Sequence, residues 1–142
     1  MTKTLADSLH LHPVQRHDAS PVPFREFAEV AEVLSLDFAR RAAELDQSGE
    51  APAANVAALH EVGLLRLVIP RRSGGLGFGL QQAVKIVGRI SQGEPATGLI
   101  LAMHYLQHGT FSEALYSADV LARVRQDALR GPALVNALRV EP

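Results

Sequence analysis

Residues 64–79 decide the fold of this chain, and they read LLRLVIPRRSGGLGFG. A short apolar run ends at Pro70, two arginines follow, and four glycines within six positions lead into an amphipathic segment. Glycine has no Cβ and reaches positive φ without strain, so the loop is predicted to be a tight path that comes close to another group. That group is either a ligand beside Gly74, Gly75 and Gly77 or the packed helices that the loop joins.

The glycine loop departs from the common nucleotide-binding patterns. The dinucleotide fingerprint has glycines at its first, third and sixth positions, but the frame that starts at Gly75 reaches Leu80 at the sixth. A phosphate-binding loop needs a lysine and then a serine or threonine after its glycines, and no such pair follows here. The sequence therefore argues against both nucleotide sites.

The loop and its flanks form an ordered set of motifs. The first part, HEVGLLRLVIPRRSGGLGFG, joins a helix end, a "GL…VP" run, a "GGxG" loop and the next helix. The second, ISQGEPATGLILAMHYLQHG, is a helix end followed by an apolar helix that opens near Ala96-Thr97-Gly98. In this order the motifs resemble the N-terminal domain of the acyl-CoA dehydrogenase family. The resemblance covers about residues 24–131, and ALVNALRVEP is similar to the approach to that family's middle β-domain.

Composition limits the class of protein. A chain of 142 residues fits one domain with a real core. Its net charge of -1 provides no positive field for a phosphate backbone, so nucleic acid is a poor partner. The chain has no cysteine, which excludes disulfides and thiolate chemistry. No apolar run is long enough to span a membrane and no leader-like segment opens the chain, so we expect a cytoplasmic protein.

Apolar residues spaced by three or four predict an all-α helical bundle of five or six helices over residues 24–131. Gly49, Gly63, Gly93 and Gly131 are expected to end four of them. Residues 64–69 fit either a strand or a connection, and the resemblance favours the connection. Residues 1–23, which contain His10, His12 and His17, are expected to be a flexible N-terminal arm, and residues 132–142 the start of a linker to an absent middle β-domain. The expected helices span residues 23–48, 52–62, 80–93, 95–109 and 119–130.

The same periodicity predicts which faces are buried. The first helix should bury a stripe from Phe27 to Leu45. Helix 95–109 has almost no polar face and should be buried on nearly all sides. Ser117 or Asp119 is a plausible N-cap for the last helix. The stripe expected for helix 80–93 comprises Leu80, Ala83, Val84, Val87 and Ile90.

Candidate chemistry lies on helix 95–109, where His104 and His108 are four residues apart and share a face. Each is a candidate hydrogen-bonding or proton-carrying residue on a cavity wall. The structural alternative is that His104 is a hydrogen-bonded core residue and that His108 lies near the frayed end of the helix. An HxxxH pair also suits zinc, but no third ligand is evident, so we assign no metal. Glu94 and Glu113 are most simply explained as solvated charges at the helix ends. The resemblance implies that Ile100, Leu101, His104 and Tyr105 form the wall of an acyl pocket, with His108 one turn further along.

The resemblance also implies a function. Members of the family bind FAD mainly through a middle β-domain and a C-terminal helical bundle, and the bundle carries the catalytic glutamate. This chain has no counterpart of either, so we expect no catalytic residue here, and FAD or FMN bound in the complete enzyme but not tightly by this chain alone. The implied reaction is α,β-dehydrogenation of an acyl thioester, although another small apolar substrate would also fit.

Two alternatives remain open. The chain may be described as a domain of a reduced-flavin-dependent monooxygenase of the same fold, or as a non-catalytic helical binding module. The apolar character of helix 95–109 further predicts association, either as a homo-oligomer or with a partner domain or chain.

Overall fold

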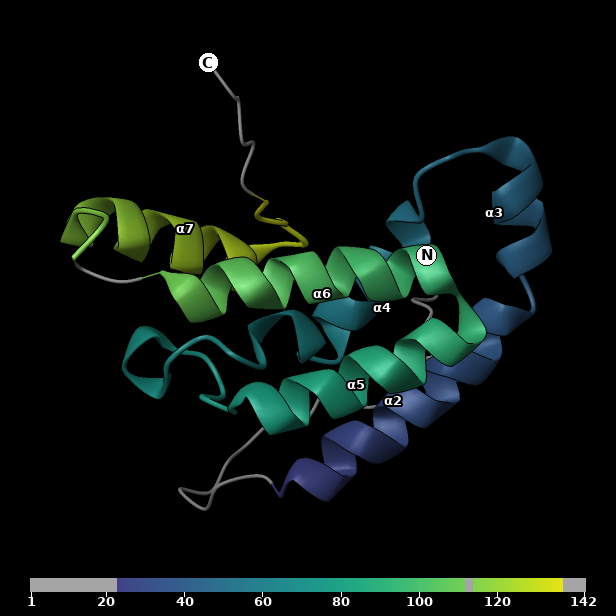
Figure 1. The fold of residues 1–142 in the computed structure, drawn as a ribbon, viewed down its shortest axis with the longest axis horizontal. Coiled ribbons are helices and arrows are strands. Elements are labelled where there is room, and N and C mark those ends of the chain that lie inside the picture. Colours follow the sequence, from purple (N-terminus) through teal and green to yellow (C-terminus); the bar gives the residue numbers. More distant parts are fainter. Residues whose placement is uncertain (1–22, 112–113, 137–142) are drawn as a thin grey trace, which may run out of the picture.

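The computed structural model describes residues 23–111 and 114–136, and every regular element within them is helical (Figure 1). The predicted all-α bundle is confirmed, with six α-helices and two short 3-10 turns, η1 and η2, in these residues. The predictions made for residues 1–22, for Glu113 and for residues 137–142 concern positions outside the described part of the chain. The elements are α2 (Phe24–Ala39), α3 (Ala42–Ser48), α4 (Ala53–Glu61), η1 (Leu64–Arg66), η2 (Arg71–Ser73), α5 (Leu80–Gly93), α6 (Pro95–Thr110) and α7 (Ala118–Arg130).

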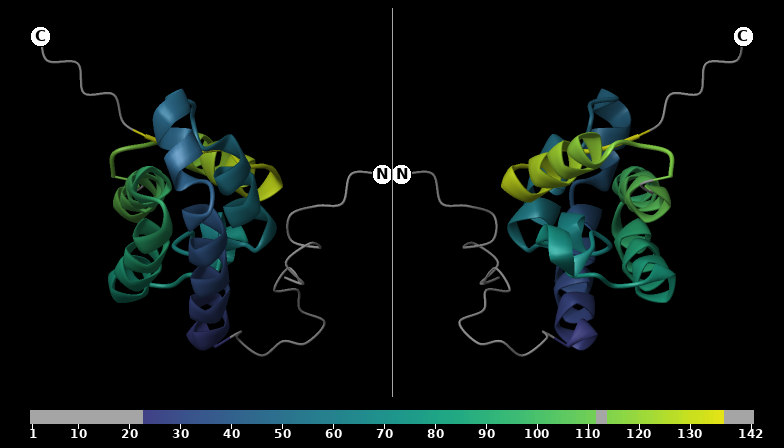
Figure 2. Two further views of the ribbon diagram at one scale, coloured as in Figure 1. Left: turned by 90° about the vertical axis from the view of Figure 1, so that its right-hand side faces the viewer. Right: turned by 90° about the vertical axis from the view of Figure 1, so that its left-hand side faces the viewer.

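Helix α5 is the centre of the packing. It lies against α2 on one side and forms an antiparallel hairpin with α6 on the other, joined by the single residue Glu94. Figure 2 shows α5 and α6 on one side of the core, and α4 with the two turns on the other. Helix α7 packs against the turns. The fully buried side chains at the centre include Phe27, Phe38, Leu59, Leu65, Ile86, Ile90 and Leu101.

The first predicted helix is broken into α2 and α3 at Arg40 and Arg41, so its prediction as one continuous helix is wrong. The Arg40 amide bonds the Asp37 carbonyl at 3.2 Å, a tightened final turn, and the Arg41 guanidinium pairs with the Asp37 carboxylate at 2.7 Å. The buried stripe ends at Phe38, and Leu45 is only half-buried. Helix α3 buries no residue, so core packing does not hold it in line with α2.

Residues 64–69 form a connection and not a strand, as the resemblance favoured. The chain leaves α4 through Gly63, whose φ of 83° is the left-handed conformation expected at a helix end. Leu64, Leu65 and Leu67 then insert into the core through the short turn η1. This stretch is rich in apolar residues because most of its side chains are buried, whereas Arg66 and Val68 are partly exposed.

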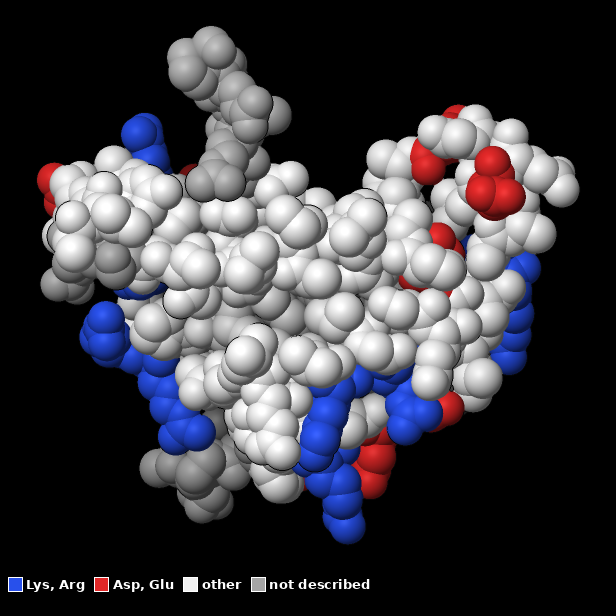
Figure 3. All heavy atoms as spheres, viewed as in Figure 1, with Lys and Arg blue, Asp and Glu red and all other residues white. Residues whose placement is uncertain are grey.

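The outer faces of α5 and α6 are more exposed than predicted. Leu80 and Val84 are 80% and 61% exposed, so their assignment to the buried stripe of α5 is wrong; Ile86 lies there instead. Helix α6 is not buried on nearly all sides, because Leu99 and Leu106 are 64% and 54% exposed. The apolar composition predicted that these segments are helices. It did not predict how much of each helix surface is buried against the rest of the domain. Figure 3 shows the result as an uncharged face over α5 and α6, with basic side chains below it.

Two glycines allow close helix packing. A Cβ on Gly93 would lie 2.0 Å from the backbone oxygen of Ser35, so this glycine permits the contact between α5 and α2. A Cβ on Gly98 would meet the Ser91 hydroxyl at 2.0 Å, where α6 approaches α5. Gly93 is the last residue of α5, so it ends this helix and also permits the close contact with α2. Within the described residues, no helix is both long and apolar enough to cross a membrane.

Candidate functional site

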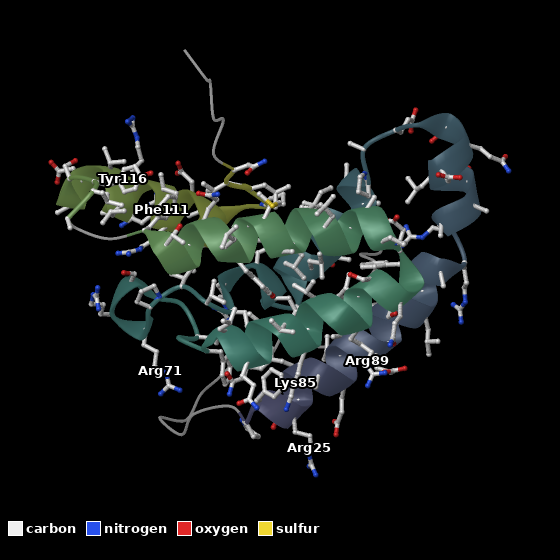
Figure 4. All side chains as sticks on the ribbon, in the orientation of Figure 1. Arg25, Arg71, Lys85, Arg89, Phe111 and Tyr116 are labelled. Carbon is white, nitrogen blue, oxygen red and sulfur yellow. The ribbon has the colours of Figure 1, made fainter. Side chains whose placement is uncertain are left out.

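A cavity of about 790 Å³ lies between the end of the glycine loop, the first half of α5 and the second half of α6. Most of its wall is apolar, and α7 contributes Arg125. Phe111 and Tyr116 are in edge-to-face contact, with ring centroids 5.3 Å apart, where α6 ends and α7 approaches (Figure 4). The apolar lining includes Val68, Phe78, Val87, Met103 and Leu106.

His108 lines this cavity and has no hydrogen-bond partner within the described residues. Its side chain is 3% exposed, and both ring nitrogens lack a partner. The ring lies between two aromatic neighbours, with centroids 4.5 Å from His104 and 5.5 Å from Phe111. Burial, with smaller effects of His104 and Arg125, lowers the pKa of His108 to about 4. The imidazole is therefore neutral at pH 7 and has one donor and one acceptor to offer a ligand.

His104 is fully buried, and both of its ring nitrogens have partners. Nε2 lies 2.8 Å from the carbonyl oxygen of Leu65, and the Val135 amide lies 3.4 Å from Nδ1. These partners fit the neutral tautomer in which Nε2 carries the proton. Burial lowers the pKa of His104, with a smaller opposing effect of the bond to Leu65. His104 does not belong to the cavity lining of this domain.

Tyr105 and His108 are the two predicted pocket residues that the cavity brings together. The Tyr105 hydroxyl donates to the Leu64 carbonyl at 2.7 Å, and burial raises the pKa of this phenol well above its usual range. Leu101 is buried in the core, and Ile100 packs against the core at its edge. Neither lines the cavity, and a pocket role for Ile100, Leu101 and His104 in a complete enzyme stays a prediction.

The glycine loop directs its backbone inward. The amides of Gly75, Leu76, Gly77 and Phe78 all bond carbonyl oxygens of residues 66–70, at 2.9 to 3.2 Å. Gly74 and Gly77 have φ of 89° and 66°, and a Cβ on Gly75 would lie 2.1 Å from the Ile69 oxygen. Each of these glycines therefore has a conformational or packing reason. The cavity lining takes in Phe78 and Gly79 but not Gly74, Gly75 or Gly77, whose proximity to a ligand stays a prediction.

Glu94 caps α6 and is buried, so its explanation as a solvated charge is wrong. Its carboxylate accepts from the amides of Ala96 and Thr97 at 2.9 and 2.7 Å and from the Thr97 hydroxyl. Burial raises the pKa of Glu94, but these hydrogen bonds outweigh it and hold the pKa below its usual value. Asn55 of α4 donates to the Thr97 hydroxyl oxygen at 2.9 Å. Glu94 is thus a structural acid that positions α6.

Arg125 is a site residue that the sequence analysis missed. It is 6% exposed, lines the cavity, and its Nε lacks an acceptor among the described residues. The spacing of Leu121, Arg125 and Ala128 places all three on the buried face of α7, so periodicity contained the signal. Ser117 caps this helix as expected, with its hydroxyl 3.4 Å from the Val120 amide.

The zinc alternative gains no support from the described residues. Among them, no group of three or more histidine, cysteine, aspartate or glutamate side chains is placed to hold a metal ion. His104 also directs Nε2 at a backbone carbonyl and not towards His108.

Known proteins are similar to this chain in sequence. Residues 25–116 match the family model described as the N-terminal domain of acyl-CoA dehydrogenase. Benzylmalonyl-CoA dehydrogenase of Aromatoleum aromaticum is 29% identical over 104 residues, which are 73% of this chain and 28% of that protein. The probable FMNH2-dependent monooxygenase SfnC of Pseudomonas putida is 32% identical over 88 residues, which are 62% of this chain and 22% of that protein.

A solved structure has the same fold. TdsC from Paenibacillus sp. A11-2, in complex with FMN and indole, matches with a TM-score of 0.64 and 24% identity. The match covers 74% of this chain and 26% of TdsC. The chain thus spans only about a quarter of the length of these relatives.

Proposed function

Because the chain belongs to the acyl-CoA dehydrogenase family, whose N-terminal domain it matches over residues 25–116, we propose that it is the substrate-side domain of a flavin-dependent oxidoreductase. One observation carries the proposal: an apolar cavity beside α6 has, at its wall, a buried histidine whose two ring nitrogens find no partner among residues 23–111 and 114–136. A buried polar group without a partner is costly, so such a group facing a cavity favours a bound ligand as its partner.

In this function the chain binds and orients the substrate. The apolar wall would exclude water from the substrate's body, and His108 would donate to or accept from one polar atom of it. Tyr105 would act as fixed wall, since its hydroxyl is already bonded to Leu64. No catalytic base is assigned to this chain, and the resemblance assigns that base to another domain.

The residues of this chain could make only a few of the contacts that hold a flavin. The loop amides that would suit a phosphate chain are engaged with backbone carbonyls. His108 and Arg125 line the cavity with nitrogens that have no partner among the described residues, and these fit one polar atom of a ligand. A bound flavin, FAD or FMN, would supply a two-electron acceptor or, when reduced, reactivity towards dioxygen.

The first candidate reaction is α,β-dehydrogenation of an acyl thioester, in line with the family and with the name of the Aromatoleum relative. The second is oxygenation of a small apolar substrate with reduced flavin. It is favoured by a neutral buried histidine on the cavity wall and by the name of the Pseudomonas relative. A neutral imidazole can pass a proton to a developing oxygen anion, whereas a plain acyl pocket needs no such group.

The test uses the complete product of the gene, including any coding sequence downstream. Reduction of its flavin by acyl-CoA compounds without oxygen would support the dehydrogenase. Oxygen uptake that requires added reduced FMN and an aromatic substrate would support the monooxygenase. His108→Ala should raise KM or lower turnover in either case, with Gln107→Ala on the same helix as the control. A product without β-domain sequence, flavin or turnover would instead support the non-catalytic module.

A further inference from the structure

We propose that Arg125 and His108 form a binding site for the carboxylate group of a ligand whose apolar body fills the cavity. This inference rests on the proposed function, because it names the chemical class of the substrate that the same cavity takes.

Arg125 provides the first argument. Arg125 is only 6% exposed, and within the described part of the chain its buried Nε has no acceptor and no acidic side chain pairs with it. A buried arginine normally has a carboxylate or phosphate beside it, because an uncompensated charge in the interior is strongly unfavourable. The other arginine at the cavity, Arg72, is exposed and already has an interaction of its own. Among the described residues that line this cavity, Arg125 is therefore a buried cation without a paired anion.

His108 provides the second argument. It lines the same cavity, and neither of its ring nitrogens has a partner in the described part of the chain. The positive charge of Arg125 contributes to the lowered pKa of His108. As a neutral imidazole it can donate one hydrogen bond, and a carboxylate has a second oxygen free after it pairs with a guanidinium. The two side chains come from different helices, α6 and α7, and meet at one cavity.

The charge and the lining select the ligand class. With His108 neutral at pH 7, the site holds one unpaired positive charge, which matches a monoanionic carboxylate better than a phosphate dianion. The remaining wall is made mainly of aliphatic and aromatic side chains, among them Val68, Phe78 and Met103. A carboxylic acid with an aromatic or branched apolar body fits both parts.

The experiment titrates the 142-residue chain with phenylacetate and with its neutral isostere phenylacetamide, by calorimetry and by NMR of the histidine rings. The expected result is a preference for phenylacetate of about tenfold. Arg125→Met should abolish this preference, whereas Arg123→Met, at an exposed position of the same helix, should keep it. Phenylacetate should also raise the pKa of His108, since a nearby anion stabilises the imidazolium.

Stability separates binding from a structural role. Arg125→Met should unfold at the same temperature as the unchanged chain or higher, because no protein partner of the guanidinium is lost. A marked fall in its melting temperature would overturn the proposal. Two measurements test the preference for a carboxylate independently of how Arg125→Met folds. They compare phenylacetate with phenylacetamide on the unchanged chain and on the His108→Phe variant.

The outcomes distinguish this proposal from the proposed function. Equal binding of the two probes would overturn the carboxylate site and leave the apolar cavity as the substrate pocket. No binding of either probe, nor of indole, would remove the support for both. Concentration-dependent association that Arg125→Met abolishes would assign the guanidinium to an acidic group of a second chain, and would also overturn the carboxylate ligand.

Discussion

The imidazole of His104 is tied to the backbone of Leu65, with Nε2 2.8 Å from the carbonyl oxygen. The next residue, Tyr105, makes the same kind of bond to Leu64 at 2.7 Å. Two consecutive side chains of α6 thus satisfy two consecutive carbonyls of the buried connection that precedes the glycine loop. The connection has no strand partner, so these bonds replace those of a sheet.

Replacing His104 with alanine should destabilise the fold. The substitution leaves the Leu65 carbonyl and the Val135 amide without their bonds, at a cost of about 1–3 kcal/mol. Chemical denaturation of the isolated chain measures this. His60→Ala is the control, since its Nε2 contacts the Leu129 carbonyl only at 3.4 Å and should cost less. Unchanged stability with impaired turnover of the complete protein would instead support a ligand-facing role.

His108 should make the fold sensitive to acid. Its pKa is about 4 in the folded chain against 6.5 in the unfolded chain, so below pH 6.5 the unfolded chain binds a proton that the folded chain does not. Stability is therefore full above pH 6.5, falls between pH 6.5 and about 4, and levels off below.

The measurement is denaturation at several pH values for the unchanged chain and for His108→Leu. In the unchanged chain, uptake of up to one proton by His108 on unfolding steepens the fall of the unfolding free energy with decreasing pH by up to ~1.4 kcal/mol per pH unit. The variant should lack this contribution to the slope. His104 has a lowered pKa too and contributes with the same sign, so the difference between the two proteins is the quantity to compare. Identical slopes would show that His108 is not buried in its neutral form.

Gly93→Ala should weaken the contact between α5 and α2. Its Cβ would collide with the Ser35 backbone oxygen, and backbone cannot move aside cheaply, so we expect a loss of about 1–3 kcal/mol. Gly88→Ala is the matched control on the same helix, because its Cβ would meet no atom within 4 Å. That control should gain about 0.5–1 kcal/mol from helix propensity. Thermal unfolding of both variants compares them, and equal effects would contradict the packing role.

The isolated chain should bind flavin weakly or not at all and have no dehydrogenase turnover. The resemblance assigns most flavin contacts and the catalytic base to other domains, and positioned groups supply most of a catalyst's effect. Titration with FAD and with FMN, followed by flavin fluorescence, tests this. Tight stoichiometric quenching would show that this domain holds the cofactor by itself.

The apolar face of α5 and α6 should promote association. Leu80, Val84, Leu99 and Leu106 are each more than half exposed there. An uncharged surface of this kind favours a covering partner or a second copy. Sedimentation over micromolar concentrations should show self-association that Leu99→Gln with Leu106→Gln reduces. A monomer at all concentrations that binds no hydrophobic dye would contradict this prediction.

Much of the fold could be predicted from the sequence because its signals are local. Periodic apolar stripes gave the helices, and Gly63 and Ser117 marked helix ends through their own backbone chemistry. The exposure of Leu80 and Leu99 could not be predicted, since it depends on what lies opposite each helix face. The break of the first predicted helix at Arg40 also reflects tertiary packing, because α2 contributes buried residues to the core and α3 contributes none.

The candidate site was harder to predict because it joins distant segments. The motif on α6 predicted Tyr105 and His108 as pocket residues. Arg125 was not predicted, because it lies on another helix, where a charged residue interrupts the apolar stripe. The roles of His104 and His108 differ because of what faces their rings. Sequence spacing puts both on one face of α6, but only the folded chain brings the Leu65 carbonyl to one of them.

The packing of α2 against α5 has a consequence for synthesis on the ribosome. Helix α2 is made first, but α5, its main partner, follows only after the whole segment through Gly79 has been translated. The buried face of α2, which includes Phe27 and Phe38, therefore lacks its main cover during that interval, when nascent chains are open to aggregation and to chaperones. Chains stalled at Gly79 should be cleaved readily by protease within α2, and chains stalled beyond Gly109 should resist.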